Sequence, residues 1–194
     1  MLGDGNDLVV ETTGLDTIFT TITRSLVGHA AIENLLLQGA GNINGTGNDG
    51  LNGIAGNSGN NTLAGQGGND ALEGQGGNDF LFGQAGQDSL VGGAGSDTFG
   101  YQIAAHSLAG PTCDYIRDFD DAGDDRIDLR GVFAGALNYM GAAAFSGANQ
   151  VRIHDIAGPN LVVAVNLDAD GLPEMQILLL NTTLAQLAID DFLL

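Results

Sequence analysis

One nine-residue unit is repeated six times without interruption between residues 47 and 100. The six units read GNDGLNGIA, GNSGNNTLA, GQGGNDALE, GQGGNDFLF, GQAGQDSLV and GGAGSDTFG. Glycine holds the first and fourth positions of every unit, and Ile, Leu or Phe holds the eighth. A fixed short period predicts stacked units of equivalent structure. A flexible glycine-rich linker is the alternative, but a linker has no reason to place a large apolar residue at every ninth position.

Each unit has to contain a turn followed by a short strand. We expect the two glycines to adopt positive φ and to let the backbone approach a bound ion closely. The last three residues form the strand, and only the middle one points inward because side chains alternate along a strand. Two successive units complete one coil, so a unit stacks on the unit two places further along, about 4.8 Å away.

The sixth position of the units carries an amide or a carboxylate. Its occupants are Asn52, Asn61, Asp70, Asp79, Asp88 and Asp97. Stacked aspartates at strand spacing repel one another and need a counter-ion, and a hard cation with oxygen ligands meets that need. Calcium suits a flexible turn of carbonyl and carboxylate oxygens better than magnesium does, because calcium accepts six to eight ligands.

The six units resemble the RTX (repeats-in-toxin) family, whose G-G-x-G-x-D-x-U-x nonads wind into a right-handed parallel β-roll. The resemblance implies an all-β fold and several Ca²⁺ ions, each held by carbonyls and an Asp from two stacked turns. The first implied ligand set is Gln66, Gly68, Asp70, Gly83, Ala85 and Asp88. The second implied set is Gln75, Gly77, Asp79, Gly92, Ala94 and Asp97.

Two regions flanking these sets offer weaker candidates. Asn52 and Asn61 replace the carboxylate by an uncharged amide, so we expect weak or empty sites there. After the last repeat, CDYIRDFDDAGDDRIDL resembles the segment that follows the roll in serralysin-type proteases and in alginate-epimerase R modules. Asp114, Asp118 and Asp125 in this segment are candidate ligands for the ends of the two stacks, with solvated loop carboxylates as the alternative.

The chain is expected to consist of three parts. Residues 1–46 are expected to form partial, irregular solenoid coils, residues 47–100 the β-roll, and residues 101–194 a small C-terminal β domain. Residues 2–10 and 11–19 are expected to be two further nonads in register, which suggests a fragment of a longer array. Asp7 and Asp16 would then occupy sixth positions on adjacent turns. Between Thr20 and Thr46 the period lapses, and we expect longer coils without calcium.

Charge and composition exclude several functions. Five basic residues face 24 acidic ones in 194 residues, and the formal net charge of -19 argues against nucleic-acid or anionic-membrane binding. So much self-repulsion predicts that the calcium-free chain folds poorly. The single cysteine rules out an intrachain disulfide, and metal ions could replace disulfides as the stabilising link. No stretch approaches 18 apolar residues, so no membrane insertion is expected.

Phe80 and Phe82 flank an inward Leu81 and should therefore point outward. The neighbours of Phe82 on the same sheet are expected to be Ala64 and Gly100, both small. An exposed apolar ridge of this kind predicts a covering surface, either the C-terminal segment or a second subunit.

Two motifs lie near the C-terminus. NLDADG, residues 166–171, copies the first half of an EF-hand loop, but Ile177 stands where the twelfth-position glutamate is required, which favours a plain hairpin turn. The final residues, TLAQLAIDDFLL, resemble the uncleaved signal of substrates of type I (ABC transporter) secretion. A terminal strand that caps the core is a compatible alternative.

The sequence contains no catalytic constellation that we recognise. There is no H-E-x-x-H or G-x-S-x-G motif, and the three histidines lack metal-ligand spacing. We therefore expect a calcium-folded, secreted, extracellular C-terminal module, with any catalytic domain upstream. The alternatives are a carbohydrate-binding or epimerase-associated module and the tip of an RTX adhesin.

Overall fold

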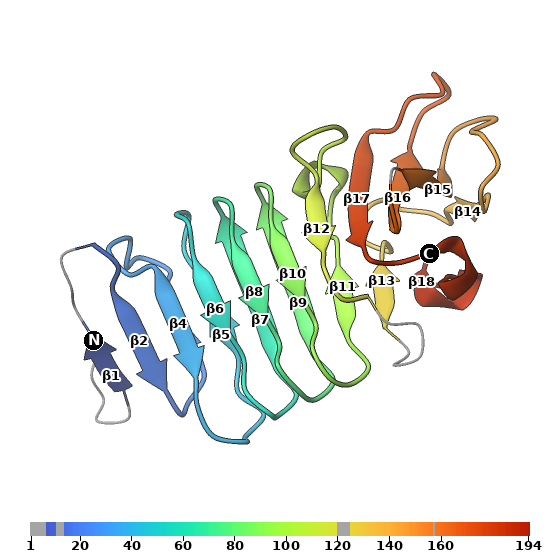
Figure 1. Cartoon of the computed structure of the whole chain (residues 1–194). Helices are drawn as coiled ribbons and strands as arrows, with labels where there is room; N and C mark the ends of the chain where they lie inside the picture. The colour runs from blue at the N-terminus through green and yellow to red at the C-terminus, as the bar shows by residue number, and fades with distance from the viewer. Residues whose placement is uncertain (1–6, 11–13, 120–124, 157) are drawn as a thin grey trace.

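The computed structural model describes residues 7–10, 14–119, 125–156 and 158–194. Its strands stack side by side into an elongated solenoid, and a smaller group of strands and short 3₁₀ turns packs at the far end (Figure 1). Within the described residues the strands form two sheets, one with eleven strands and one with seven. No helix in the described part of the chain is long and apolar enough to cross a membrane.

The larger sheet contains the even-numbered strands of the solenoid and most of the C-terminal strands. In spatial order these are β1 (Asp7–Val10), β2 (Thr17–Thr20), β4 (Asn34–Leu37), β6 (Gly53–Ala55), β8 (Ala71–Glu73), β10 (Ser89–Val91), β12 (Asp114–Ile116), β17 (Met175–Leu180), β16 (Asn160–Asn166), β15 (Gln150–Ile156) and β14 (Asn138–Tyr139).

The smaller sheet contains the odd-numbered strands of the solenoid. In spatial order these are β18 (Phe192–Leu193), β13 (Arg126–Asp128), β11 (Thr98–Gly100), β9 (Phe80–Ala85), β7 (Thr62–Gly67), β5 (Gly45–Thr46) and β3 (Arg24–Ser25). The described residues also include three 3₁₀ turns: η1 (Ala104–His106), η3 (Leu184–Gln186) and η4 (Ile189–Asp191).

Neighbouring roll strands are parallel and pair residues 18 apart, as the nine-residue period predicts. Leu63 lies opposite Leu81 in one sheet, and Leu72 lies opposite Leu90 in the other. The eighth-position side chains of all six units are buried, and that of Phe99 has no exposed area. Each coil therefore contributes one apolar side chain from each sheet to a thin continuous core.

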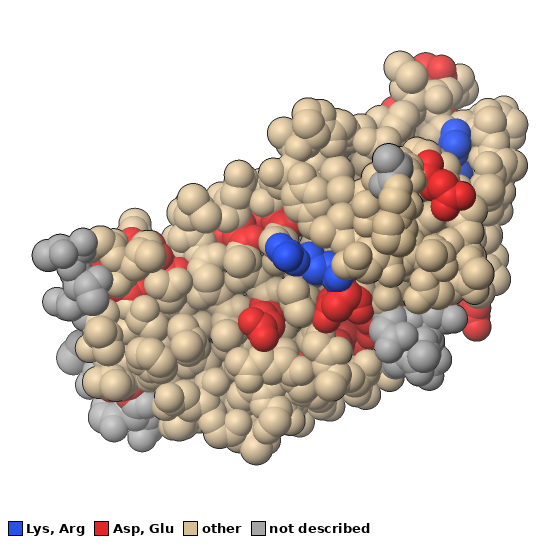
Figure 2. Space-filling model, viewed as in Figure 1, with Lys and Arg blue, Asp and Glu red and all other residues tan. Residues whose placement is uncertain are grey.

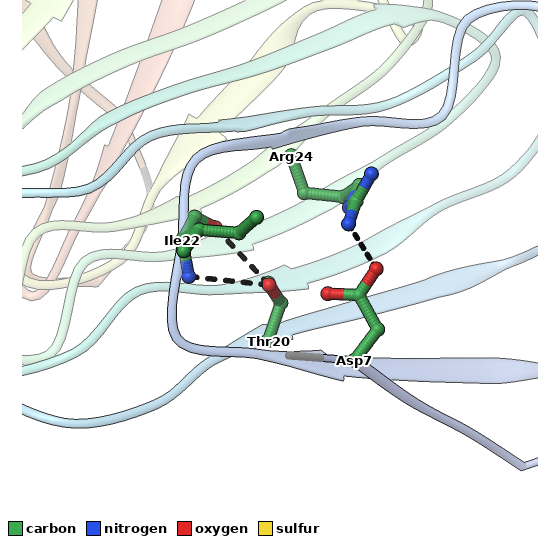
Figure 3. Close-up of polar contacts among 4 residues, drawn as sticks. All are labelled: Asp7, Thr20, Ile22 and Arg24. Carbon is green, nitrogen blue, oxygen red and sulfur yellow. Dashed lines mark hydrogen bonds and ion pairs between the residues drawn. The ribbon is translucent and has the colours of Figure 1, made fainter. Parts of the chain in front are cut away.

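The first strand corrects the expectation that residues 2–19 form two further nonads in register. β1 is antiparallel to β2, with Val10 opposite Thr17, so these strands form a hairpin instead of successive solenoid turns. Residues 1–6 and 11–13 of the two expected nonads lie outside the described residues. Asp7 consequently forms an ion pair with Arg24 (Figure 3). The Thr20 hydroxyl bridges the backbone N–H and C=O of Ile22 in the turn before Arg24, which places the arginine opposite Asp7.

The larger sheet continues through the stretch where the period lapses. β4 lies between β2 and β6, and all three strands are parallel, as expected for continued coils. Leu35 pairs with Ile18 on one side and with Ile54 on the other, and all three side chains are buried. The irregular coils thus share the core of the regular roll.

Both sheets also continue past residue 100. β12 adds to β10, and β13 adds to β11, each in parallel, before β17 and β18 join the outer edges of these strands. β15, β16 and β17 then form an antiparallel meander. The C-terminal strands therefore extend the roll directly, and the division at residue 101 stays a prediction.

The outward phenylalanines differ in exposure. Leu81 is fully buried, whereas Phe80 is 47% exposed. Phe82 is half-buried: it pairs with Ala64, and its ring fills the space that a Cβ at Gly100 would need. The expected small neighbours are thus beside Phe82, and the covering surface stays a prediction.

Candidate metal centre

The sixth-position side chains form two columns, one along each edge of the solenoid. In each column a carboxylate Oδ1 accepts a hydrogen bond from the backbone N–H of the residue one coil earlier. The first column runs Asn52, Asp70, Asp88, Asp114, with N–O distances of 2.8, 2.8 and 2.9 Å. The second runs Asn61, Asp79, Asp97, Asp125, with distances of 2.7, 2.8 and 2.8 Å. All eight residues are buried.

The second carboxylate oxygen of most of these aspartates has no partner. Buried Oδ2 atoms without a hydrogen bond are found on Asp70, Asp79, Asp88, Asp97 and Asp114. Leaving one buried charged oxygen unpaired costs several kcal/mol, and a regular row of such atoms indicates a missing cationic partner.

Burial dominates the titration of these carboxyls. It raises the pKa of Asp70 to about 7, of Asp79 and Asp88 to about 6, and of Asp114 to about 8. Backbone hydrogen bonds oppose this rise, and charge on the stacked aspartate adds to it for Asp70 and Asp79. Burial likewise raises the pKa of Asp97. A divalent cation between the stacked carboxylates would favour their charged forms.

The first-position glycines leave room for an ion beside each orphaned oxygen. A Cβ at Gly65 would collide with Asp70 Oδ2 and would lie 2.7 Å from the carbonyl oxygen of Gly83. A Cβ at Gly74 would collide in the same way with Asp79 Oδ2 and the Gly92 carbonyl. A carboxylate and a carbonyl from stacked turns therefore converge on one small space, which fits a hard cation with oxygen ligands.

The turn geometry corrects one expectation about the glycines. Positive φ occurs at the fourth position in the last four units, in Gly68, Gly77, Gly86 and Gly95, as expected, but not in Gly50 and Gly59 of the first two units. The first-position glycines do not adopt it; they are required for close approach instead. The second position adopts positive φ in Gln66, Gln75 and Gln84, where the sequence has no glycine to signal it. This conformation orients the backbone of the second to fourth residues, which include all the expected carbonyl ligands except the first-position Gly83 and Gly92.

In the first two units the sixth-position side chain makes different hydrogen bonds at the same edge of the solenoid. The Nδ2 of Asn61 donates to the Ile43 carbonyl at 2.6 Å and to Asn57 Oδ1 at 3.1 Å. Asn52 Nδ2 donates to the Glu33 carbonyl at 3.3 Å and to Asn48 Oδ1 at 3.3 Å. The amide oxygen also has a partner, because the Asn57 N–H donates to Asn61 Oδ1 at 2.8 Å and the Asn48 N–H donates to Asn52 Oδ1 at 2.7 Å. The amide oxygen, which lies beside the first-position glycine, thus takes the place of the unpaired Oδ2 of the aspartates.

Comparisons with known proteins agree with this geometry. The model of the RTX calcium-binding nonapeptide repeat matches residues 45–81 and 65–99. Among solved structures, the chain is similar to the AlgE6R3 subunit of the Azotobacter vinelandii mannuronan C5-epimerase, with 31% identity, a TM-score of 0.57, and coverage of 74% of this chain and 78% of that one. The chain belongs to the RTX family of calcium-binding β-roll proteins.

A second RTX relative extends the similarity. The AlgE6R2 subunit of the same epimerase is 26% identical, with a TM-score of 0.57, and the match covers 80% of this chain and 94% of that one. Among curated protein sequences none matches the chain. The similarity is to repeat modules and does not involve a catalytic domain.

The segment after the RTX repeats brings all three expected carboxylates to the ends of the columns. Asp114 and Asp125 each continue one column, as described above. Asp118 accepts hydrogen bonds from the backbone N–H groups of Gly92 and Gly93, at 3.0 and 2.9 Å. Asp118 is therefore already engaged by the last turn, whereas the buried Asp114 Oδ2 is unpartnered.

Sequence reasoning missed one buried hydroxyl beside this column. Tyr101 is 2% exposed, and burial together with the negative charge of Asp114 and Asp88 raises the pKa of its phenol well above the usual value. A tyrosine directly after the last nonad carries no periodic signal, so only the fold places it near Asp114.

A second polar ladder also escaped the sequence analysis. At the fifth position, Asn60 Oδ1 accepts from the Asn78 backbone N–H, and Asn78 Oδ1 accepts from the Ser96 N–H. These bonds run toward the C-terminus, opposite in direction to the sixth-position bonds. Each turn is therefore bonded to its neighbours by side chains in both directions, before any ion is added.

Acidic side chains form only small groups on one face of the molecule (Figure 2). Figure 2 shows a face that is mostly neither acidic nor basic, with a few small acidic groups and some basic side chains near its centre. The roll aspartates at the sixth position are buried and do not contribute to the solvent-exposed surface. These four buried carboxylates are thus placed where ions, and not water, would neutralise them.

Proposed function

We propose that the aspartate turns of this calcium-binding β-roll module, residues 65–100, need calcium in both columns to fold stably at neutral pH. The observation that carries the proposal is the row of buried Oδ2 atoms without partners at Asp70, Asp79, Asp88, Asp97 and Asp114. Each ion would lie between two stacked carboxylates and the carbonyls beside them, in the two six-residue ligand sets that begin with Gln66 and Gln75. Calcium supplies the charge that lets the carboxylates stay ionised in a buried row. Further ions at Asp114 and Asp125 would close the columns.

Calcium titration followed by circular dichroism and small-angle scattering tests this proposal. We expect the chain to be expanded in EGTA and compact with β signal at millimolar calcium, the range of extracellular modules. A D70N/D88N variant should need far more calcium to fold. The control D49N/E73Q removes the same charge from exposed positions of the roll and should behave as the native chain does. An equally compact native chain in EGTA would refute the proposal.

Calcium-dependent folding would also suit a role in export. Low calcium inside a cell would keep the chain unfolded for passage through a type I exporter, and calcium outside would then fold it. The final residues support this idea, because Phe192 is buried and β18 is paired with β13 in the folded chain. A terminal signal would therefore be accessible only before folding. Co-expression with a type I exporter tests it: removal of residues 191–194 should abolish secretion of the otherwise intact chain.

Glycan binding is the second candidate function. Arg117, at the end of β12, lines a hollow of about 340 Å³ on the outer face of the larger sheet, together with Leu36, Ala55, Glu73 and Val91. Residues 47–100 contain no basic residue, and the fold brings Arg117 to the surface of the sheet that they form. The solved relatives are subunits of a mannuronan epimerase. Binding of mannuronan oligosaccharides at fixed calcium, with Arg117→Ala for comparison, separates this function from a purely structural one.

A further inference from the structure

The hairpin between β16 and β17 gathers three carboxylates outside the roll. Asp168, Asp170 and Glu174 each place one carboxylate oxygen within 4.8 Å of the other two. Among the described residues, no arginine forms an ion pair with any of the three. Three converging negative charges without a basic neighbour repel one another unless a cation lies among them.

A buried amide beside this cluster is also without a partner. Asn166 has no exposed area, and neither its Oδ1 nor its Nδ2 makes a hydrogen bond. Val165 pairs with Met175, and the Glu174 N–H donates to the Val165 carbonyl at 3.0 Å, so Asn166 lies opposite Glu174. Residues directly opposite in antiparallel strands project to the same face. The unpartnered amide of Asn166 is thus on the side of the hairpin where Glu174 is.

The loop leaves oxygens free for a ligand role. Asp168 Oδ1 accepts from the Asp170 N–H at 2.9 Å, and Glu174 Oε2 accepts from the Leu167 N–H at 2.5 Å. Each carboxylate therefore uses one oxygen to hold the loop and retains another. Gly171 has φ of 82°, the left-handed conformation that allows the sharp turn at this point.

The spacing matches that of a calcium loop up to its ninth position. Counting Asn166 as the first residue, the oxygen-bearing side chains stand at positions one, three, five and nine, with glycine at six. Ile177 at position twelve is buried in β17, so no bidentate glutamate is available there. The hairpin expected from the sequence is present, and its short return brings Glu174 to the cluster instead.

We propose that Asn166, Asp168, Asp170 and Glu174 form a separate site for a single hard divalent cation, of which calcium fits best. The carbonyl of Leu172, at position seven, is placed by spacing to be a further ligand. The site is independent of the stacked turns of the roll. Its ion would tie the ends of β16 and β17 together, and β17 is the strand that joins this meander to β12.

Counting bound calcium ions in the complete chain tests this site. Equilibrium dialysis against calcium, with metal analysis, compares the native chain with D168N/D170N and with E174Q. The control D155N/D190N removes the same charge from exposed residues outside the cluster. Circular dichroism of every sample verifies that the roll is folded.

We expect both loop variants to bind one ion fewer per chain than the native protein and the control. E174Q keeps an acceptor for the Leu167 N–H, so it retains the loop even if the double variant disturbs it. An ion count equal to that of the control in both variants would overturn the proposal. A roll that fails to bind calcium while the loop still binds one ion would leave this site intact and refute the proposed function instead.

Discussion

Two halves of the roll share one pattern of strand pairing and differ in their turns and in how they satisfy the buried edge. Residues 47–64 place asparagine at the sixth position, and the amide donates to carbonyls of the preceding coil. Residues 65–100 place aspartate there, and one oxygen of each carboxylate has no protein partner. Both atoms of each asparagine amide have partners within the protein, since the oxygen accepts from the N–H of Asn48 or Asn57. Each aspartate leaves one buried oxygen for the cation that we propose.

Removal of calcium should produce the largest difference in stability between the two halves. In EGTA we expect backbone amides of residues 65–100 to lose nearly all protection from hydrogen exchange, because each unpaired carboxylate destabilises its turn. Residues 47–64 should retain more protection, since stability in a solenoid is a sum over turns and interfaces. Exchange followed by mass spectrometry measures both. Equal loss of protection in both halves would contradict the expected difference between the asparagine turns and the aspartate turns.

A methyl group at the proposed ion position should have the next largest effect on stability. Gly74→Ala places a Cβ where Asp79 Oδ2 and the Gly92 carbonyl lie, so we expect a loss of about 3 kcal/mol in calcium-dependent stability. Gly41→Ala is the control, because its nearest neighbour would be Ile43 Cγ2 at 3.9 Å. Thermal denaturation at fixed calcium compares the two. Similar midpoints would show that the space beside Asp79 does not hold an ion.

The asparagine half can be tested by converting it. Asn61→Asp removes the amide donors to the Ile43 carbonyl and Asn57 Oδ1 and adds a charge above Asp79, at a cost of about 2 kcal/mol without calcium. High calcium should recover part of this loss if the turn can accept an ion. Chemical denaturation at several calcium concentrations measures the recovery. No destabilisation in chelator would contradict the role given to the amide.

A change of pH should alter the stability and the calcium affinity of the aspartate half. The effect should be smaller than those of the changes above. Because folding raises the pKa of Asp70 to about 7 and of Asp114 to about 8, the calcium-free fold is most stable at low pH. It loses stability as pH rises from the unfolded value of 3.8 through these folded values. Calcium needs the ionised carboxylates, so its apparent affinity should fall about tenfold or more between about pH 8 and about pH 5. Calorimetric titration across that range measures it, and a pH-independent affinity would contradict the burial of the ligands.

The smallest effect should come from the surface of the roll. Phe80 is 47% exposed, so Phe80→Ser should change stability by less than about 0.5 kcal/mol if nothing covers it. A larger loss that depends on protein concentration would indicate self-association through this ridge. Analytical ultracentrifugation of the native chain and the variant distinguishes these results.

The period of nine explains why most of the roll could be predicted from the sequence. It fixes which residue points inward, which residues stack and where the carboxylates align, so the pairing of Leu63 with Leu81 follows directly. The ligand sets also follow from the period together with the family resemblance, and they stay predictions until ions are located. The C-terminal strands could not be assigned in the same way, because no repeat marks their partners.

The sequence-based expectations were wrong where the nonad pattern continues without the glycine that stacked turns require. Residues 2–19 imitate two nonads, but the first of these has Leu2 where the close approach of stacked turns requires glycine. β1 instead turns back on β2. The left-handed conformation of Gln66 was missed because the residue type does not favour it. The positions of Tyr101 beside the column and of Arg117 beside the hollow depend on long-range packing, which sequence spacing does not encode.

The alternation of strands between two sheets has a consequence for how such a chain can change in length. Consecutive nonads belong to opposite sheets, and β12 and β13 must meet β10 and β11 respectively. Deleting a single nonad would exchange the sheets for everything downstream, so the C-terminal strands would arrive on the wrong side. Such an array can therefore gain or lose only whole coils of 18 residues, that is two nonads at a time. Only then do β12 and β13 keep their pairing with the last strands of the roll.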